Sequence, residues 1–220
     1  MQPIEILFED YYLMVVNKPR GIATDLANPS ETSVKSLVLD YLNKKHPDRK
    51  KHQVGIPHRI DKPVGGLVVV TKTPQALKNL NEQFASRLVT KKYMGWVEGN
   101  MSSASGTLEH WIGRNDTRKK AVVSNTEQNE CKPCSLTYTV RKHSAAYSLL
   151  EIELNTGRYH QIRAQFSFTG HPVAGDELYG AQKRNEPGIM LWSVQLSFSH
   201  PKTGEPLNFE LDAAFISNAF

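Results

Sequence analysis

Short segments with strand-like composition follow one another along most of this chain, and few helix-like segments interrupt them. These runs are rich in β-branched and aromatic residues, and Gly, Asn or His-Pro groups separate most of them. They lie at residues 4–8, 12–17, 66–70, 92–98, 107–112, 135–142, 147–154, 190–198 and 207–211. Because regular alternation of strands and helices is absent, we expect an α+β fold with a mainly antiparallel mixed sheet.

Three segments have the pattern of helices. In residues 33–42 the apolar side chains recur with helical spacing, and a basic surface loop is expected at 44–52. Thr73 and Pro74 stand where an N-cap and an N1 proline would begin a second helix. Its expected apolar stripe is formed by Leu77, Leu80, Phe84 and Leu88. A third, short helix is expected after Thr156-Gly157 and is expected to be closed by Gly170.

The composition is that of a folded globular protein with a basic charge balance. With 220 residues, the chain is long enough for one continuous domain of one or two lobes. A net charge of +5 and a pI near 9.1 are typical of nucleic-acid binders, although many basic proteins bind no nucleic acid. The N-terminus lacks a signal-peptide pattern and no apolar run reaches membrane-spanning length, so we expect a cytoplasmic protein.

Metal and redox chemistry have little support in the sequence. Cys131 and Cys134 are the only cysteines, and strand-like segments flank this pair, which favours an incidental turn. The spacings among His58, His160 and His171 fit no compact metal motif. We therefore expect no metal site.

One loop carries an acid and a base immediately before an apolar strand. Arg59 and Asp61 lie in the Pro- and Gly-punctuated stretch 57–66. Catalytic groups concentrate in loops that rigid strands hold, but a solvated surface pair would have the same pattern. This loop alone does not decide between the two interpretations.

A second polar segment leaves a strand through Thr156 and Gly157. If its following residues are helical, His160 and Arg163 lie on one face, whereas Arg158 and Arg163 point about 140° apart. The two arginines would then have different partners. The glycine-rich stretch 170–180 comes next and suggests tight backbone positions beside a site.

Taken together, these motifs resemble the RluA family of RNA pseudouridine synthases in order and spacing over most of the chain. They are Asn17-Lys18-Pro19-Arg20-Gly21, His58-Arg59-Ile60-Asp61, Lys92-Tyr93, and Thr156-Gly157-Arg158 through Gly180. One stretch departs from the pattern: the family continues the Asp loop with two more residues and then Thr-Ser-Gly, whereas this chain has Val64-Gly65-Gly66. The missing hydroxyls leave open how this loop is shaped.

The resemblance implies a pseudouridine synthase-like catalytic domain over residues 1–220, with a central RNA-binding cleft and no separate N-terminal RNA-binding domain. It implies isomerisation of uridine to pseudouridine at specific positions in ribosomal or transfer RNA, by a monomer that needs no cofactor. The implied catalytic residues are Asp61, Tyr93 and Arg163. Asp61 would assist cleavage of the glycosidic bond, as a nucleophile or as a base that leads to a glycal. Arg163 would keep Asp61 ionised.

The other implied site residues contact the RNA. Arg59 is expected to fill the gap left when the uridine flips out of its helix. The remaining substrate-binding residues are expected to be His58, Arg158, His160 and Lys92. Further basic side chains at 44–45, 49–51, 91–92 and 118–120 would contact phosphates, although each could be solvated surface.

Three alternatives remain at this stage. The chain could be an RNA-binding protein of the same fold that has lost catalysis, for which only Val64-Gly65-Gly66 gives support. It could be a glycosidic hydrolase, but that chemistry uses paired carboxylates and only Asp176 offers a second one. Tyr93, expected to stack on the uracil and manage its C5 proton, could instead be a core aromatic of its strand, with Met94 and Trp96 on the opposite face.

Overall fold

The computed structural model describes residues 4–25, 31–48, 51–185 and 188–217, and within them the chain forms two compact units. The first unit comprises Met1–Thr90 and Ser193–Leu211, and the second comprises Lys91–Trp192 and Asp212–Phe220. Arg49 and Lys50 of the predicted basic loop lie outside the described residues. No helix of the described ranges is both long and apolar enough to cross a membrane.

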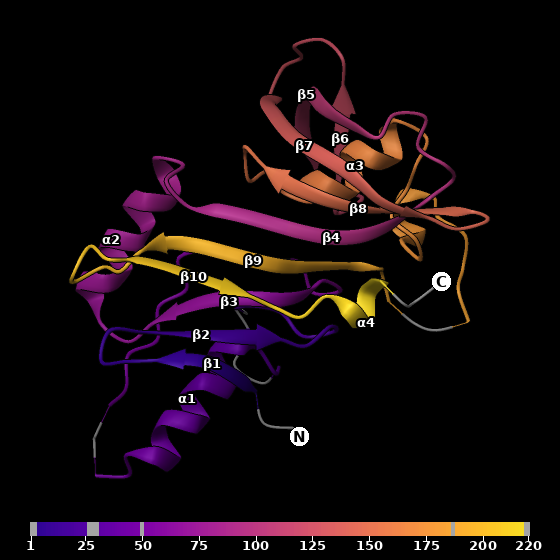
Figure 1. The fold of residues 1–220 in the computed structure, drawn as a ribbon. Coiled ribbons are helices and arrows are strands. Elements are labelled where there is room, and N and C mark those ends of the chain that lie inside the picture. The colour runs from indigo at the N-terminus through magenta and orange to yellow at the C-terminus, as the bar shows by residue number, and fades with distance from the viewer. Residues whose placement is uncertain (1–3, 26–30, 49–50, 186–187, 218–220) are drawn as a thin grey trace. The chain divides into compact units, whose positions relative to one another are not determined.

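The first unit is built on antiparallel strands. β1 (Glu5–Glu9), β2 (Leu13–Lys18), β3 (Gly65–Thr71) and β9 (Leu191–Ser199) lie side by side in this order, and β10 (Pro206–Glu210) pairs with β9 (Figure 1). All seven residues of β3 are buried, because neighbouring strands flank it and side chains cover it on both faces. The core cluster joins Leu13, Leu67 and Leu196 of three strands to Leu80 of a helix.

Two helices belong to the first unit, and their starts follow the predicted signals. α1 (Val34–Lys45) begins after Ser33, which forms a capping box with Ser36. α2 (Pro74–Ala85) begins after Thr73, whose hydroxyl accepts a hydrogen bond from the Ala76 N–H at 3.2 Å. The predicted ends were wrong: Lys44 and Lys45 form the last turn of α1 instead of a loop, and Leu88 lies beyond α2 and is 69% exposed.

The second unit is an antiparallel sheet with one face covered by a helix. Its strands are β4 (Thr90–Glu98), β8 (Tyr147–Leu154), β7 (Lys132–His143), β5 (Ser105–Asn115) and β6 (Lys120–Ser124), in that spatial order. α3 (Gln161–Phe168) packs on the sheet, because Phe166 contacts Tyr138 edge-on with ring centroids 5.7 Å apart. A 3₁₀ turn, η1 (Glu177–Tyr179), and the short α4 (Ala214–Ser217) complete the described elements.

Most predicted strands and the α+β class are confirmed. β6 was missed, because its five residues stand between a basic and a polar stretch and carry only a short apolar run. Lys91 and Lys92, which are among the basic side chains expected to contact phosphates, lie within β4. The third helix is confirmed, but α3 begins only at Gln161, so the helical-wheel placement of Arg158 and His160 does not apply: His160 is the N-cap, with a left-handed backbone at φ 52°.

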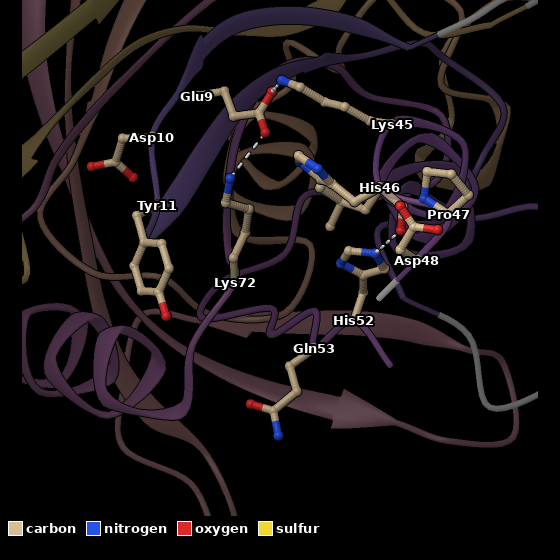
Figure 2. A pocket seen from close by; sticks show the side chains of 11 residues that line it. Glu9, Asp10, Tyr11, Lys45, His46, Pro47, Asp48, His52, Gln53 and Lys72 are labelled. Carbon is tan, nitrogen blue, oxygen red and sulfur yellow. Dashed lines mark hydrogen bonds and ion pairs between the residues drawn. The ribbon is translucent and has the colours of Figure 1, made fainter. Parts of the chain in front are cut away.

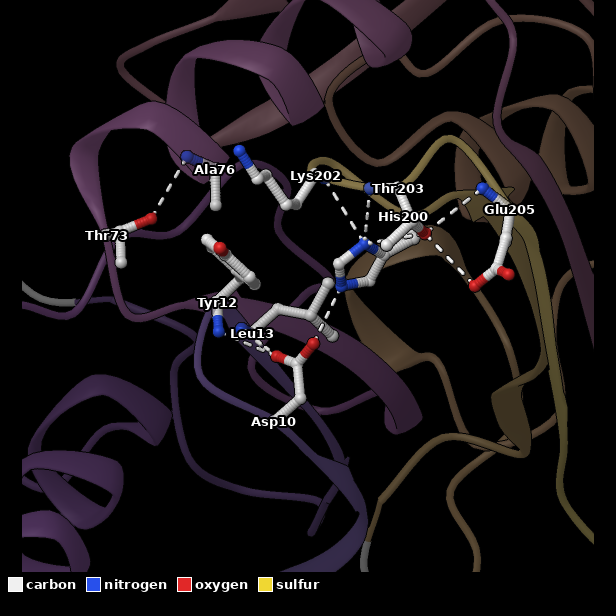
Figure 3. Close-up of polar contacts among 9 residues, drawn as sticks. All are labelled: Asp10, Tyr12, Leu13, Thr73, Ala76, His200, Lys202, Thr203 and Glu205. Carbon is white, nitrogen blue, oxygen red and sulfur yellow. Dashed lines mark hydrogen bonds and ion pairs between the residues drawn. The ribbon is translucent and has the colours of Figure 1, made fainter.

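A buried histidine links two turns of the first unit (Figure 3). The Nδ1 atom of His200 accepts the N–H of Thr203 at 3.0 Å, which leaves the ring proton on Nε2. Nε2 lies 2.7 Å from Oδ2 of Asp10, and Oδ1 of Asp10 accepts the N–H groups of Tyr12 and Leu13. The turn between β1 and β2 is thereby fixed to the turn between β9 and β10.

Lys18 is a fully buried cation near the end of β2. Its Nζ donates to the carbonyl oxygens of Pro19 at 3.0 Å, Ile22 at 2.7 Å and Lys62 at 3.2 Å. Burial lowers the pKa of Lys18 to about 8, and the negative charge of Asp61 opposes this shift. One side chain therefore holds the turn after β2 against the loop that carries Asp61.

A pocket of about 770 Å³ beside α1 is lined by charges that neutralise one another (Figure 2). Glu9 lies between Lys45, 2.7 Å away, and Lys72, 2.9 Å away, and it also accepts a hydrogen bond from Tyr41. Burial alone would raise the pKa of Glu9, but these three hydrogen bonds outweigh it and lower the pKa to about 2. No residue predicted for the catalytic site lines this pocket.

Glu9 should make the stability of the protein depend on pH. Its pKa is lower in the folded chain than the ordinary 4.5, so its contribution is complete above about pH 4.5 and is lost as the pH falls towards 2. We expect Glu9→Gln to lower the free energy of unfolding by about 1 to 2 kcal/mol at pH 7, and by less at pH 3. Denaturant titrations at both pH values measure this, with Glu82→Gln on the exposed side of α2 as control. An equal loss at both pH values would contradict the assignment.

Lys18→Met should destabilise the chain strongly, because it removes the ammonium donor from three carbonyl oxygens, of which, among the described residues, only that of Lys62 also accepts a backbone N–H. We expect a loss of about 3 kcal/mol in the free energy of unfolding. Lys78→Met, which removes an exposed lysine of α2, should change this quantity by less than about 0.5 kcal/mol. If both variants unfold at the same denaturant concentration as the wild type, the three hydrogen bonds do not hold the loop.

Candidate active site

The loop that carries Asp61 is held by backbone hydrogen bonds on both sides of the carboxylate. The Thr24 hydroxyl donates to the Ile60 carbonyl at 3.0 Å and accepts the Ile60 N–H at 3.2 Å. The Lys62 carbonyl accepts the N–H of Gly21 at 2.8 Å in addition to the ammonium of Lys18. Asp61 itself is partly exposed, and the backbone on both sides of it is fixed.

The departure at Val64-Gly65-Gly66 has a structural explanation. The N–H of buried Val64 donates to the Asp61 carbonyl at 3.0 Å and closes the loop without a side-chain hydroxyl. Gly66 has φ +110°, and a Cβ atom there would lie 2.1 Å from the Ser193 carbonyl oxygen. Glycine is therefore required where β3 meets β9, and the loop that bears Asp61 closes through its own backbone.

The two residues before Asp61 differ in their surroundings. The His58 ring stacks on Phe84 with centroids 4.7 Å apart, and its Nε2 accepts the N–H of Val69 at 3.0 Å. His58 therefore anchors the loop to β3. Arg59 is exposed, as a residue that contacts RNA must be.

Tyr93 lies on the helix-covered face of the second unit. It pairs with Ile152 of β8, which pairs with Tyr138 of β7, and cross-strand partners share a face. Tyr138 contacts Phe166 of α3, so the Tyr93 ring is on the side of the sheet where α3 packs. Its side chain is 7% exposed. Lys92 points to the opposite face, where its Nζ lies 3.5 Å from Glu151.

Arg163 and Asp176 form a buried ion pair within the second unit. The Nε and Nη2 atoms of Arg163 donate to the two carboxylate oxygens of Asp176 at 2.6 and 2.9 Å, and both side chains are almost fully buried. The guanidinium also lies 5.0 Å from the centroid of the Tyr179 ring. The carboxylate that the hydrolase interpretation would need is therefore bound to an arginine.

The turn before α3 is shaped by Gln161. Its Oε1 accepts hydrogen bonds from the Thr156 hydroxyl at 2.8 Å and from the Arg158 N–H at 3.0 Å. Its Nε2 donates to the Ser135 carbonyl of β7 at 3.1 Å. The turn is thus bound to the sheet, and Arg158 extends from it with its Nε donating to the Pro133 carbonyl.

His160 belongs to a small aromatic group at the same turn. Its Nδ1 lies 3.0 Å from the Tyr179 hydroxyl, which accepts the N–H of Ala121 at 2.7 Å. The Tyr159 ring stacks on His160 with centroids 3.8 Å apart, and Arg114 lies 4.7 Å from the same ring. These contacts hold the left-handed backbone of His160 in place.

The structure places the predicted site residues in separate units. His58, Arg59 and Asp61 belong to the first unit, whereas Lys92, Tyr93, Arg158, His160 and Arg163 belong to the second. Sequence reasoning did not foresee Gln161, Tyr179 or the pairing of Asp176 with Arg163. The signal for the last two was the glycine-rich stretch 170–180, because Gly175 and Gly180 have positive φ on either side of η1.

Comparisons with known proteins agree with the motifs. The family model described as RNA pseudouridylate synthase matches residues 12–168. An uncharacterized RNA pseudouridine synthase of Bacillus subtilis is 35% identical over 94% of this chain and 68% of its own length. The ribosomal large subunit pseudouridine synthase D of Vibrio parahaemolyticus is 33% identical over 94% of this chain and 66% of its own length. The chain thus spans about two thirds of the length of these relatives.

Two solved human structures share the fold. RNA pseudouridylate synthase domain containing 4 superposes with a TM-score of 0.80 at 21% identity, over 97% of this chain and 90% of that one. RNA pseudouridylate synthase domain containing 1 superposes with a TM-score of 0.78 at 24% identity, over 96% of this chain and 86% of that one. At this identity the two structures establish the fold alone. With the family model and the bacterial relatives, the predicted resemblance is confirmed, and this chain belongs to the RNA pseudouridylate synthase family.

Proposed function

We propose that this chain converts a uridine of ribosomal RNA to pseudouridine, with Asp61 as the reactive carboxylate. We favour ribosomal RNA over transfer RNA because two relatives, which are 35% and 33% identical to this chain, are named ribosomal large subunit pseudouridine synthase D. We further propose that the two units act as one catalytic domain, as a monomer in the cytoplasm. The observation that carries the proposal is the loop of Asp61, which is fixed by Lys18, Thr24 and Val64 although the residues after it depart from the family pattern.

The reaction needs few chemical groups. The bond from uracil N1 to ribose C1′ breaks, a bond from C5 to C1′ forms, the proton on C5 leaves, and N1 gains a proton. No electrons are exchanged with a cofactor and no water is consumed. An ionised Asp61 serves either route, as the nucleophile at C1′ or as the base that removes the C2′ proton to form a glycal.

Tyr93 suits the part of the reaction in which the detached uracil turns. Its ring is buried on the face of the sheet that α3 covers, which offers an apolar surface to a base. Its phenol is the polar group that would manage the C5 proton. We therefore assign Tyr93 to holding the base.

Arg163 suits the role of the cation that keeps Asp61 ionised. Asp176 occupies the Nε and Nη2 edge of its guanidinium, and a guanidinium has five N–H donors, which is more than one carboxylate engages side by side. We propose that Asp176 is a positioning residue, which sets the direction of Arg163 without touching the RNA.

The remaining basic residues are assigned to the RNA backbone and to base flipping. We propose that exposed Arg59 occupies the position that the flipped uridine leaves. Arg158, His160 and Lys92 would contact the RNA around the target, and His58 would support the loop of Asp61. Phosphate contacts of this kind position the RNA but do not read its sequence.

Asp61→Asn should abolish isomerisation while the protein stays folded and binds RNA. Neither a nucleophile nor a base remains, so we expect the single-turnover rate to fall by at least ~10²–10⁴-fold. Wild type and variant would be incubated with ribosomal and transfer RNA from cells that lack this gene, and pseudouridines mapped by chemical labelling and sequencing. Asp48→Asn, a control in an exposed loop, should retain full activity.

The outcome on the two RNA classes tests the substrate. New pseudouridines in ribosomal RNA alone support the proposal, whereas new sites in transfer RNA alone contradict its choice of substrate. If the wild type binds RNA but makes no pseudouridine in either class, the chain is an RNA-binding protein without catalysis.

Asp176→Asn tests the positioning role. The variant loses the charge that faces buried Arg163, so the guanidinium can turn, and we expect kcat to fall by about a hundredfold with little change in KM. Stopped-flow turnover and thermal unfolding would be measured together, with Glu177→Gln at the exposed neighbouring position as control. If kcat recovers fully once the variant is assayed below its unfolding temperature, Asp176 contributes stability only.

A further inference from the structure

Lys91 differs from the other lysines around the predicted site. It lies two residues before Tyr93 in β4, and side chains two apart in a strand share a face. The Lys91 side chain is therefore on the face of the sheet where α3 packs, like Tyr93. Its Nζ reaches the turn before α3, because a Cβ atom built on Gly157 would lie only 3.3 Å from it.

No carboxylate of the neighbouring strand lies on that face. In the register of β4 with β8, Lys92 pairs with Glu153 and Met94 pairs with Glu151, so both glutamates point to the opposite face. Glu151 there binds Lys92 and Arg141. On the Lys91 face, β8 and β7 place Ile152 and Tyr138 beside Tyr93.

Lys91 consequently has no counter-ion that the structure shows. Among residues 4–25, 31–48, 51–185 and 188–217 it has neither an ion-pair nor a hydrogen-bond partner. Burial lowers the pKa of Lys91, because the ammonium loses contact with water there and no anion among the described residues compensates for that loss. An anionic ligand beside Nζ would remove that cost.

We propose that Lys91 binds a backbone phosphate of the RNA, next to the nucleotide whose base lies at Tyr93. Two residues of a strand span about 7 Å, so a group at Lys91 can reach the sugar-phosphate of a nucleotide held at Tyr93. An ammonium is a compact charge that suits a phosphate oxygen and reads no base. Arg158, which extends from the turn that Lys91 reaches, adds a second positive charge there.

This assignment rests on the proposed function, and it places the Lys91 ammonium directly beside Gly157. The ammonium occupies the space that a side chain would fill, since 3.3 Å is closer than ordinary contact with a Cβ atom. Gly157 is not one of the described glycines with a positive φ, so its backbone conformation does not require glycine.

The experiment compares the salt dependence of RNA binding in four proteins. A labelled RNA stem–loop with uridines in its loop is titrated with wild type, Lys91→Met, Lys91→Arg and Lys78→Met at several salt concentrations. Loss of one phosphate contact should reduce the slope of log K against log salt by about 0.7 to 0.9, and raise Kd about fivefold near 0.15 M salt. We expect this for Lys91→Met, with the slope kept in Lys91→Arg and in the control Lys78→Met.

Each outcome bears on one proposal. A Lys91→Met variant that is folded by circular dichroism and keeps the wild-type slope overturns the phosphate contact, even if its activity falls. An equal change of slope in Lys78→Met also overturns it, because the effect is then general charge. If wild type makes no pseudouridine but the slope depends on Lys91, the proposed function fails and the phosphate site stands.

Discussion

The buried pair of Arg163 and Asp176 is the interaction on which the second unit depends. A carboxylate and a guanidinium that are each almost fully buried have given up their hydration, and their attraction returns little net stability. Such a pair is costly to break because the remaining charge would be left unpaired. Its effect is to fix direction: α3 cannot turn about its axis and the segment around η1 cannot withdraw without separating the two charges.

The first unit fixes its loops by the same physical principle with different groups. Within the part of the chain that the structure describes, the buried ammonium of Lys18 donates its hydrogen bonds to carbonyl oxygens and not to a carboxylate. Carbonyl dipoles offset desolvation less completely than a carboxylate does, which is why its pKa falls although the charge of Asp61 opposes the fall. A buried cation whose acceptors belong to three separate backbone positions ties those positions together more strictly than apolar packing would.

The sequence predicted what depends on local patterns and missed what depends on distant ones. Strands with period-two burial and helices with capping residues were found, since these signals lie within a few residues of one another. The end of α2 was misplaced because Leu88 continues the apolar spacing, although the chain has already left the helix. The local pattern around His160 does not indicate a left-handed N-cap. This backbone conformation is held by a contact with Tyr179, which is 19 residues away in the sequence.

The sequence also does not show which basic residues are paired with carboxylates. Lys92, Arg163 and Lys91 each add one positive charge to the net charge of +5, and this count does not distinguish them. In the fold, the first is bound to Glu151 on one face of β4 and the second is enclosed with Asp176. Lys91, one residue from Lys92, differs only by the alternation of the strand, which turns it away from both glutamates of β8. Strand register therefore decides which of these two neighbouring lysines lies beside a carboxylate of β8.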